Sequence, residues 1–403
     1  MREPEVGAPP AGRVPGRSRA GPHAAGASND ALVGPGAPVA AIDTPALVID
    51  ADAMERNLER MAAFARAHGM RLRPHAKMHK SALIARLQMA AGAVGVCVQK
   101  TSEAEALAGA GVNDIYISNE VVDPAKLARV AALAARVRLA IAVDSELGIE
   151  RLAAALRAAA SRMDVFVEVD VGHGRCGVPP SSAGVLAQHV AAHEAMRFAG
   201  LQAYHGGAQH LRGAAEREAA LHRVVTLARS AQAAVTAAGI ACPLVTGAGT
   251  GSFVFEAASG VYGELQVGSY LFMDRDYADN EPAHAAPRFE HALFVKSQVM
   301  SAGLSHAVID AGHKSHAIDS GPPRVWGRDG LAYVNGGDEH GILRRADAAT
   351  PVPLPALGET VWLVPGHCDP TVNLHERYVV VRGGLEHGVV EALWPVDARG
   401  CVG

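Results

Sequence analysis

Short apolar runs alternate with longer amphipathic segments along the first three quarters of the chain. Apolar residues at helical spacing mark the longer segments, for example 51–70, 123–136, 145–161 and 213–238. Strands buried on both faces read as continuous apolar runs, so the alternation predicts a parallel sheet covered by helices. Eight runs have the length of such strands: "RLRPHA" (71–76), "VGVCVQ" (94–99), "DIYISN" (114–119), "RLAIAV" (138–143), "DVFVEV" (164–169), "FAGLQAY" (198–204), "PLVTG" (243–247) and "GELQVG" (263–268).

Eight strand–helix units predict a closed (β/α)8 TIM barrel, an α/β fold, over residues 42–290. An open doubly wound sheet is the structural alternative. It is disfavoured because no Gly-x-Gly-x-x-Gly sequence follows the first strand, where a dinucleotide-binding fold carries one.

Beyond about residue 290 the helical pattern stops, and β-type runs punctuated by Gly and Pro follow. They predict a smaller C-terminal all-β domain over residues 291–403. The strand 44–50 precedes the first helix and has no place among the barrel strands, so we expect it to pair with the β-domain. Residues 1–38 are rich in Pro, Gly, Ala and Arg and lack the apolar segment of a secretory signal. They are predicted to be a disordered tail, or to follow from a start codon assigned too far upstream.

Composition narrows the classes of partner. The 403 residues carry a formal net charge of -4, which provides no basic field for nucleic acid or an anionic membrane surface. In the sequence, no apolar run reaches the roughly 18 residues needed to span a bilayer. The five cysteines are scattered and form no Cys-x-x-Cys pair, which is typical of reduced thiols in the cytoplasm. We therefore expect a cytoplasmic protein without nucleic-acid or membrane partners.

Polar residues follow nearly every predicted strand, although charged residues make up only 19% of the chain. In a barrel enzyme the chemistry collects at the C-terminal ends of the strands, so these residues are expected to face one site. In chain order they are His75, Lys77, Gln99, Lys100, Thr101, Asn119, Asp144, His173, Arg175, Tyr204, His205, the loop 246–252 and the segment 267–270.

Lys77 and the loop "TGAGTGS" (246–252) together indicate a pyridoxal phosphate site. A Gly-rich loop exposes backbone N–H groups and hydroxyls that can hold a phosphate, and barrel phosphate sites favour the loops after strands seven and eight. A lysine in a partly desolvated site has a depressed pKa and can form a Schiff base. Arg175 would then face the phenolate oxygen of the cofactor or the substrate carboxylate. The alternatives are a plain turn and a surface lysine, and Lys80 fits the surface alternative better than Lys77 does.

Seven short segments extend this pattern over residues 42–395. They read "RPHAKMHKS", "CVQKTSEAEAL", "DVGHGRCGV", "YHGGAQH", "TGAGTGS", "QVGSYLFMD" and "PGHCDPTVN". With these segments in this order, the chain resembles the D-threonine aldolase and D-serine dehydratase-like family of fold type III, alanine-racemase-like pyridoxal phosphate enzymes. The resemblance implies a barrel plus a β-domain, pyridoxal 5'-phosphate on Lys77, and a divalent metal held by the β-domain. It also implies a homodimer whose active sites are each completed by the partner's β-domain.

The predicted cofactor site follows from these segments. Lys77 is also the predicted catalytic residue, and His205 is one candidate for the base that removes the hydroxyl proton; a metal-bound water is the other. The segment "GHKSHAIDSGPP" (312–323) contains His313, Lys314, His316 and Asp319 and resembles a family segment that approaches the active site, although a polar loop explains it equally well. The predicted cofactor-binding residues are Lys77, Gln99, Arg175, Tyr204, Thr250, Gly251, Gly268, Ser269 and Tyr270.

The segment "PGHCDPTVN" (365–373) is the predicted metal site. In an extended segment, residues two apart share a face, so His367 and Asp369 are expected to point one way and Cys368 the other. An imidazole and a carboxylate, completed by water, suit Mn²⁺ first and Mg²⁺ as the alternative. In the resembling family, aldolases carry His-x-Asp here and dehydratases carry His-x-Cys, so this chain has the aldolase pattern. The alternatives are a hydrogen-bonded turn pair without metal, and a bulge that brings in Cys368 as a ligand.

The sequence therefore predicts a metal- and pyridoxal phosphate-dependent lyase. Its predicted reaction is the retro-aldol cleavage of D-3-hydroxy-α-amino acids, of the D-threonine or D-phenylserine type, to glycine and an aldehyde. A 3-hydroxyaspartate aldolase and a D-serine or 3-hydroxyaspartate dehydratase are alternatives with the same cofactor. A racemase would leave the metal site unexplained, and a non-catalytic pyridoxal phosphate carrier would need neither the β-domain nor its His-x-Asp pair.

Overall fold

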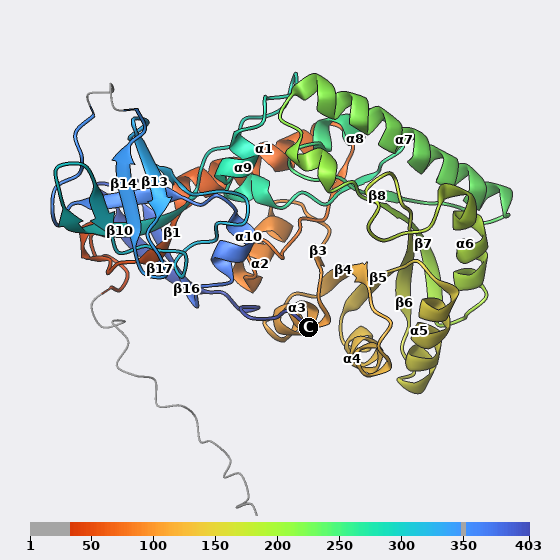
Figure 1. Cartoon of the computed structure of the whole chain (residues 1–403). Helices are drawn as coiled ribbons and strands as arrows, with labels where there is room; N and C mark the ends of the chain where they lie inside the picture. Colours follow the sequence, from red (N-terminus) through yellow and green to blue (C-terminus); the bar gives the residue numbers. More distant parts are fainter. Residues whose placement is uncertain (1–32, 348–351) are drawn as a thin grey trace, which may run out of the picture.

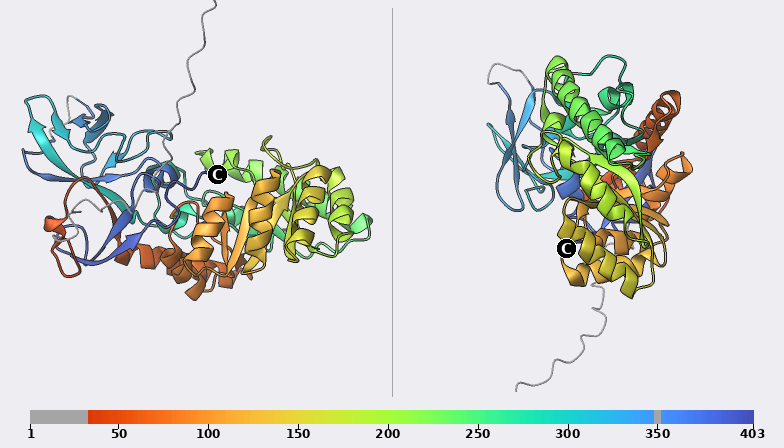
Figure 2. Two further views of the ribbon diagram at one scale, coloured as in Figure 1. Left: turned by 90° about the horizontal axis from the view of Figure 1, so that it is seen from below. Right: turned by 90° about the vertical axis from the view of Figure 1, so that its right-hand side faces the viewer.

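The computed structural model describes residues 33–347 and 352–403. Over these ranges the chain forms a barrel surrounded by helices and a β-domain beside it (Figure 1). Both views in Figure 2 show the helices on the outside of the barrel sheet and the β-domain at one side of it.

Eight parallel strands of the described chain form the barrel sheet, in the order β2-β9-β8-β7-β6-β5-β4-β3. Backbone hydrogen bonds join the ends of this row, and two of them involve Cys97. The Ala76 N–H donates to Cys97 O at 2.7 Å, and the Cys97 N–H donates to Pro74 O at 2.8 Å. The ring is therefore closed, which confirms the predicted barrel and excludes the open sheet. The strands are β2 (Arg71–Leu72), β3 (Val96–Val98), β4 (Asp114–Glu120), β5 (Arg138–Val143), β6 (Met163–Glu168), β7 (Met196–Ala203), β8 (Val245–Gly247) and β9 (Glu264–Leu265).

Helices cover the outer face of the barrel. Several of them begin where a short polar side chain caps the first turn: the Asp50 side chain accepts the Ala53 N–H, and the Asp123 side chain accepts the Lys126 N–H with Pro124 as the first helical residue. The helices are α1 (Ala51–Ala67), α2 (Ala82–Ala90), α3 (Thr101–Gly109), α4 (Pro124–Ala134), α5 (Glu146–Ala158), α6 (Ala183–Ala191), α7 (Ala214–Ala237), α8 (Phe253–Ala258) and the short α9 (Arg275–Ala278), with 3-10 turns η2 (Val39–Ala41), η3 (Pro180–Ser182), η4 (Gly207–His210) and η5 (Ser269–Leu271).

The β-domain is built on a nine-stranded sheet of the described residues. Strand β1 lies inside this sheet, antiparallel to β10 and parallel to β16, so Val48 is in register with both Phe294 and Val379. The strand without a place in the barrel is thus a central strand of the second lobe. Its strands are β1 (Ala46–Asp50), β10 (Leu293–Ala302), β11 (Ala307–Ile309), β12 (Arg324–Val325), β13 (Leu331–Asn335), β14 (Gly341–Arg345), β15 (Thr360–Val364), β16 (Arg377–Arg382) and β17 (Val389–Pro395), and it contains one short helix, α10 (Cys368–Val372).

The prediction of a disordered tail is wrong for residues 33–38, which are ordered against the β-domain. Residues 33–38 pack against β17, where the Gly36 N–H donates to Val390 O at 2.7 Å. Val33 is buried in an apolar cluster of the β-domain, and its burial holds this segment in place. The Pro- and Gly-rich composition around Val33 gave no sign of this packing. Residues 1–32 of the predicted tail lie outside the described residues.

A polar layer closes the barrel interior beneath the strand ends. The Tyr116 hydroxyl donates to Gln202 Oε1 at 3.0 Å, and Gln266 Nε2 donates to the same oxygen at 2.7 Å. Because these buried groups satisfy one another, they form a fixed floor for anything bound above them.

Candidate active site

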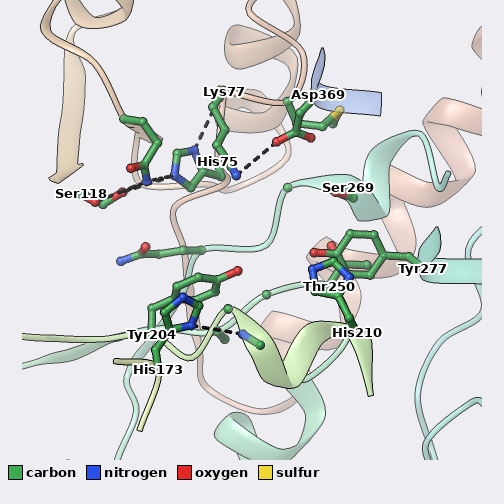
Figure 3. Close-up of a pocket in the computed structure, with 18 of the residues that line it drawn as sticks. His75, Lys77, Ser118, His173, Tyr204, His210, Thr250, Ser269, Tyr277 and Asp369 are labelled. Carbon is green, nitrogen blue, oxygen red and sulfur yellow. Dashed lines mark hydrogen bonds and ion pairs between the residues drawn. The ribbon is translucent and has the colours of Figure 1, made fainter. Parts of the chain in front are cut away.

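A cavity of about 420 Å³ opens at the C-terminal ends of the barrel strands. Figure 3 shows side chains of both lobes around it, with Lys77 after β2 and Asp369 in the β-domain facing each other. The convergence of strand ends that the sequence indicates is therefore present in part, because Lys100, Thr101, Asn119 and Asp144 do not line the cavity. The predicted site residues that line the cavity are Lys77, Gln99, Arg175, Tyr204, Thr250, Gly268, Ser269, His367 and Asp369.

Lys77 forms an ion pair across the two lobes, with its Nζ atom 3.1 Å from Asp369 Oδ2. The Asp369 charge raises the pKa of Lys77, although burial opposes the shift. The depressed lysine pKa expected from desolvation is therefore wrong for this arrangement, because a carboxylate in contact outweighs the loss of solvent. Burial alone would raise the pKa of Asp369, but the Lys77 and His367 charges lower it. Any ligand that binds the Asp369 carboxylate would weaken its ion pair with Lys77 and so lower the pKa of Lys77.

The loop after β8 is braced from behind by the buried side chain of Gln209. Its Oε1 atom accepts the Gly251 N–H at 2.9 Å, and its Nε2 atom donates to Ser252 Oγ at 2.7 Å. A Cβ atom at Gly249 would lie 2.4 Å from Gln209 Oε1, so this contact requires glycine. The sequence therefore folds this loop as a tight, fixed turn against η4.

The cavity face of this loop offers a donor set that fits a phosphate. Thr250 and Ser269 both line the cavity, and the Tyr270 N–H donates to Thr250 Oγ1 at 3.0 Å, which ties the loop after β8 to the segment after β9. A Cβ atom at Gly268 would lie 3.2 Å from His75 O, so glycine at this position lets the segment after β9 pack closely against His75. Hydroxyls and small residues after barrel strands seven and eight are the usual composition of a phosphate cradle.

Glu256 lies behind the cradle on α8 and gives a pH prediction. Ser252 Oγ donates to its Oε1 atom at 2.8 Å, and burial raises the pKa of Glu256 to about 7. The folded state thus favours the protonated acid, so this group lowers stability as pH rises from about 4.5 towards 7. We expect Glu256→Gln to raise the free energy of unfolding at pH 8 by at most about 3 kcal/mol, with the gain vanishing near pH 5. Thermal unfolding at both pH values measures this, and an equal change at both would contradict it.

Arg175 and His75 bring a fixed cation and a neutral imidazole to the same cavity. The Arg175 guanidinium carbon lies 5.7 Å from the centroid of the Tyr204 ring. Nε2 of His75 lies 2.9 Å from Gln99 Nε2 and 3.2 Å from Ser118 Oγ. Burial, and then the Lys77 charge, lower the pKa of His75 well below its usual range, so its imidazole is neutral at pH 7.

The metal segment differs from its predicted conformation. His367 is extended at the N-cap, but Cys368–Val372 form the helix α10, so the prediction of a fully extended segment is wrong. Asp369 and Pro370 in the first turn favour the helix. His367 and Asp369 still share the cavity face, and Cys368 is buried on the opposite side with its N–H donating to Asp274 Oδ2 at 3.0 Å.

The His367–Asp369 pair has the character of a metal-binding site. His367 Nε2 and Asp369 Oδ1 lie 3.8 Å apart. This carboxylate oxygen is buried and has no hydrogen-bond partner among the described residues. A buried carboxylate oxygen without a partner is costly unless a cation takes it, so the donor set fits a divalent ion. The other ring nitrogen, His367 Nδ1, contacts Asp319 Oδ2 at 2.7 Å, which directs Nε2 towards the cavity.

A second histidine–aspartate pair lies at the cavity, outside the barrel strands. His210, at the end of η4, lines the cavity, and its Nδ1 atom lies 2.6 Å from Asp276 Oδ2. Burial would raise the pKa of Asp276, but its contacts with His210 and Arg212 lower it to about 2. A permanently ionised Asp276 keeps the proton of His210 on Nδ1 and leaves Nε2 as an acceptor. Tyr277, next in the chain, lines the same cavity.

Three of the predicted catalytic and cofactor-binding residues lie beside the cavity and do not line it. The His205 ring accepts the Ala208 N–H on Nδ1 at 2.9 Å and packs against His173, which does line the cavity. Gly251 faces Gln209 on the outer side of its loop. Tyr270 is buried, with its hydroxyl accepting from Gln88 Nε2 at 3.3 Å.

The second lysine of "RPHAKMHK" is structural. Lys80 is buried, not on the surface, with its Nζ atom 3.2 Å from Glu103 on α3 and 3.4 Å from both Ala398 O and Cys401 O. It therefore holds the C-terminal segment against the barrel.

The fold and site place the chain among alanine-racemase-like proteins, and comparison with known sequences agrees. The family model "Alanine racemase, N-terminal domain" matches residues 49–276, and "Putative serine dehydratase domain" matches residues 292–381. The D-threonine aldolase of Arthrobacter sp is 47% identical over 91% of this chain and 95% of its own. The 3-hydroxy-D-aspartate aldolase of Paracoccus denitrificans (strain Pd 1222) is 44% identical over 91% and 94%.

A solved structure carries the same architecture. The crystal structure of D-threonine aldolase from Filomicrobium marinum superposes with a TM-score of 0.88 at 48% identity, covering 92% of this chain and 99% of that one. The chain therefore belongs to the D-threonine aldolase and 3-hydroxyaspartate aldolase family, which confirms the predicted resemblance. Among the described residues, helices long and apolar enough to cross a bilayer are absent.

Proposed function

We propose that the protein is a pyridoxal 5'-phosphate- and divalent metal-dependent aldolase that cleaves D-3-hydroxy-α-amino acids of the D-threonine type to glycine and an aldehyde. One observation carries the proposal: the Lys77 amine, a phosphate cradle and the His367–Asp369 pair face one cavity. The 47% identity to a D-threonine aldolase supports the substrate class.

The barrel residues would hold the cofactor. Pyridoxal phosphate, when bound, supplies an electron sink for the charge left on Cα as the Cα–Cβ bond breaks. Lys77 would hold its carbonyl carbon, and Thr250 and Ser269 its phosphate. Arg175 supplies the fixed cation for the phenolate oxygen or the substrate carboxylate. We assign to the Lys77 amine the further role of returning a proton to Cα.

The β-domain residues would hold the metal. A divalent ion on His367 Nε2 and Asp369 Oδ1 would supply Lewis-acid polarisation of the substrate β-hydroxyl. Mn²⁺ is our first choice and Mg²⁺ the second, since one imidazole, one carboxylate and water make a nitrogen–oxygen donor set without sulfur. Burial raises the pKa of the Cys368 thiol, which keeps it protonated and unsuited as a ligand.

The hydroxyl proton needs an acceptor in the cavity, and His210 fits this role better than His205. Its Nδ1 atom is held by Asp276, so Nε2 can accept a proton and the imidazolium is stabilised by the carboxylate. His205 uses its Nδ1 atom to accept a backbone N–H and does not line the cavity.

A product assay tests the proposal. The protein, loaded with pyridoxal phosphate, is given D-threonine, D-phenylserine or L-threonine, with Mn²⁺ or after chelation. We expect glycine and the matching aldehyde from the D-substrates, with Mn²⁺ dependence. Release of an oxo acid and ammonia would overturn the aldolase proposal, and unchanged activity after chelation would overturn the metal's role.

Replacing His210 and His205 one at a time separates their roles. We expect His210→Asn to lower kcat by about 10²- to 10⁴-fold, the usual contribution of a general base. His205→Asn is the matched control, and we expect a loss below tenfold. Steady-state kinetics across pH measure both, and a larger loss for His205→Asn would return the base to the position that the sequence predicts.

Asp319 is expected to act through His367. Because it fixes the ring through Nδ1, Asp319→Asn should weaken Mn²⁺ binding by about 10- to 100-fold. Calorimetric titration measures the affinity without using activity. Ser320→Ala, next in the chain and 3.4 Å from the same ring nitrogen, is the control and should change affinity little. Equal affinities in Asp319→Asn and the unmodified chain would show that Asp319 does not position the ring.

A dehydratase is the second candidate, favoured by the match of the C-terminal region to the serine dehydratase domain. It would break the Cβ–O bond and leave the Cα–Cβ bond intact. The same product assay distinguishes the two, because only cleavage of the Cα–Cβ bond yields glycine.

The proposal extends to a cytoplasmic homodimer. Free cysteines throughout the described residues fit a reducing compartment. Exposed apolar side chains on the β-domain, including Leu304, Ile318 and Trp326, offer surface for contact with a second copy. Light scattering after size exclusion should give twice the chain mass, and a fully active monomer would contradict the dimer.

A further inference from the structure

Three metal-ligating side chains converge on the outer surface of the barrel, away from the residues that line the cavity. Glu150 belongs to α5, His189 to the last turn of α6, and His193 follows four residues later. The two helices are neighbours on the outside of the barrel (Figure 1). Their three ligand atoms lie within 4.8 Å of one another.

The two distances to the Glu150 carboxylate suit the geometry around a single ion. The Nε2 atoms of His189 and His193 lie 3.0 and 3.1 Å from the same Glu150 Oε1 atom. Bonds of about 2.0–2.2 Å from an ion to nitrogen and oxygen place neighbouring ligand atoms about 3 Å apart. The imidazole planes differ by only 16°, with centroids 5.9 Å apart, so both rings reach towards the same carboxylate. His193 lies two residues beyond the end of α6, and the chain after the helix end brings its ring beside that of His189.

Hydrogen bonding is the simpler account of the same contacts. Two N–H groups could donate to one oxygen of a half-exposed carboxylate, and the Glu150 side chain is 51% exposed. Surface contacts of this kind contribute little to stability. A metal ion makes a different demand, because it requires both ring nitrogens to be unprotonated and engages all three groups at once. Metal titration therefore distinguishes the two accounts.

We propose that Glu150, His189 and His193 form a second divalent metal site, selective for ions that prefer imidazole, Zn²⁺ or Ni²⁺ above Mn²⁺ or Mg²⁺. Two nitrogens and one oxygen favour these ions by ligand type and by the general order of affinities. The bound ion clips α5 to α6. In the chain, α5 precedes and α6 follows β6 and the loop that carries His173 and Arg175. The ion therefore stabilises the two helices that support that loop.

Zinc titration in a background without the cavity site tests this proposal separately from the proposed function. The full chain carrying Asp369→Ala should bind one Zn²⁺ in calorimetric titration and unfold at a higher temperature with Zn²⁺. Adding His189→Gln and His193→Gln should weaken that binding at least tenfold and remove the thermal shift. Glu150→Gln keeps a hydrogen-bond acceptor but loses the charge, and should weaken binding as well.

His222→Gln on α7 is the matched control. This histidine is exposed and lies 3.9 Å from the carboxylate of Glu218, and it belongs to no group of three possible metal ligands among the described residues. The control should bind Zn²⁺ as its background does. The proposal is overturned if the His189→Gln, His193→Gln variant binds Zn²⁺ as tightly as the control, or if neither binds it. Both outcomes leave the aldolase proposal unaffected.

Discussion

Replacement of Lys77 by alanine is expected to lower glycine formation by on the order of 10³-fold or more and to abolish the visible absorption band of the loaded protein. Lys77 lines the cavity, and its amine can form a covalent bond to a carbonyl carbon. Losses of this order follow when a residue that forms a covalent bond during catalysis is removed. The measurement is steady-state kinetics together with an absorbance spectrum of the loaded variant.

Two controls make this result specific to Lys77. Lys126→Ala, on the outer helix α4, should leave the spectrum and kcat unchanged. Borohydride reduction of the unmodified loaded protein, followed by peptide mass spectrometry, should place the cofactor on Lys77 and leave Lys80 and Lys100 unlabelled. Label on Lys80 would contradict the assignment, although its burial against Glu103 and the C-terminal carbonyls argues for a structural role.

The barrel could be predicted because its strands are buried on both faces and follow one another around the ring. The exact residues at which the strands begin and end were less predictable. The first apolar run, 71–76, gives only a two-residue strand, since Pro74 has no N–H for the ladder. The chain nevertheless continues alongside β3, where Pro74 O accepts the Cys97 N–H, and this contact closes the barrel.

The site could be predicted where it depends on strand ends, and not where it depends on packing between distant segments. His205 lies two residues after the end of β7, which made it the natural candidate, but the turn η4 presents His210 to the cavity instead. The position of Asp276 depends on α9 docking against the metal segment, where its N–H donates to Gly366 O at 3.2 Å. Local sequence carries no signal for that contact.

The helix α10 is a case where the signal was present but given too little weight. A proline in the first turn and an aspartate beside it are ordinary features of a helix start, and both follow His367. An extended segment and a helix N-terminus both place His367 and Asp369 on one face here. The ligand pair was therefore predictable even though the backbone conformation was not.

Asp369 is expected to decide which metal binds and how well the site works. Asp369→Ala should remove measurable Mn²⁺ binding and lower glycine formation by about 10³-fold, because a Lewis acid contributes several kcal/mol to such a step. The same change removes the carboxylate 3.1 Å from Lys77, so the pKa of Lys77 should fall as its charge partner is lost. Calorimetry with Mn²⁺ and product assays measure the first two effects.

Asp369→Cys tests the ligand itself, since it keeps two protein donors but exchanges oxygen for sulfur. A thiolate with an imidazole selects Zn²⁺ over Mn²⁺, so affinity for Zn²⁺ should rise while activity with Mn²⁺ falls. Asp279→Ala, at a carboxylate that pairs with Arg275 and Arg324 outside the cavity, is the control and should keep the original metal preference. If Asp369→Cys bound Mn²⁺ as the unmodified chain does, the carboxylate would not be a ligand, and its buried, unpartnered oxygen would need another cation to satisfy it.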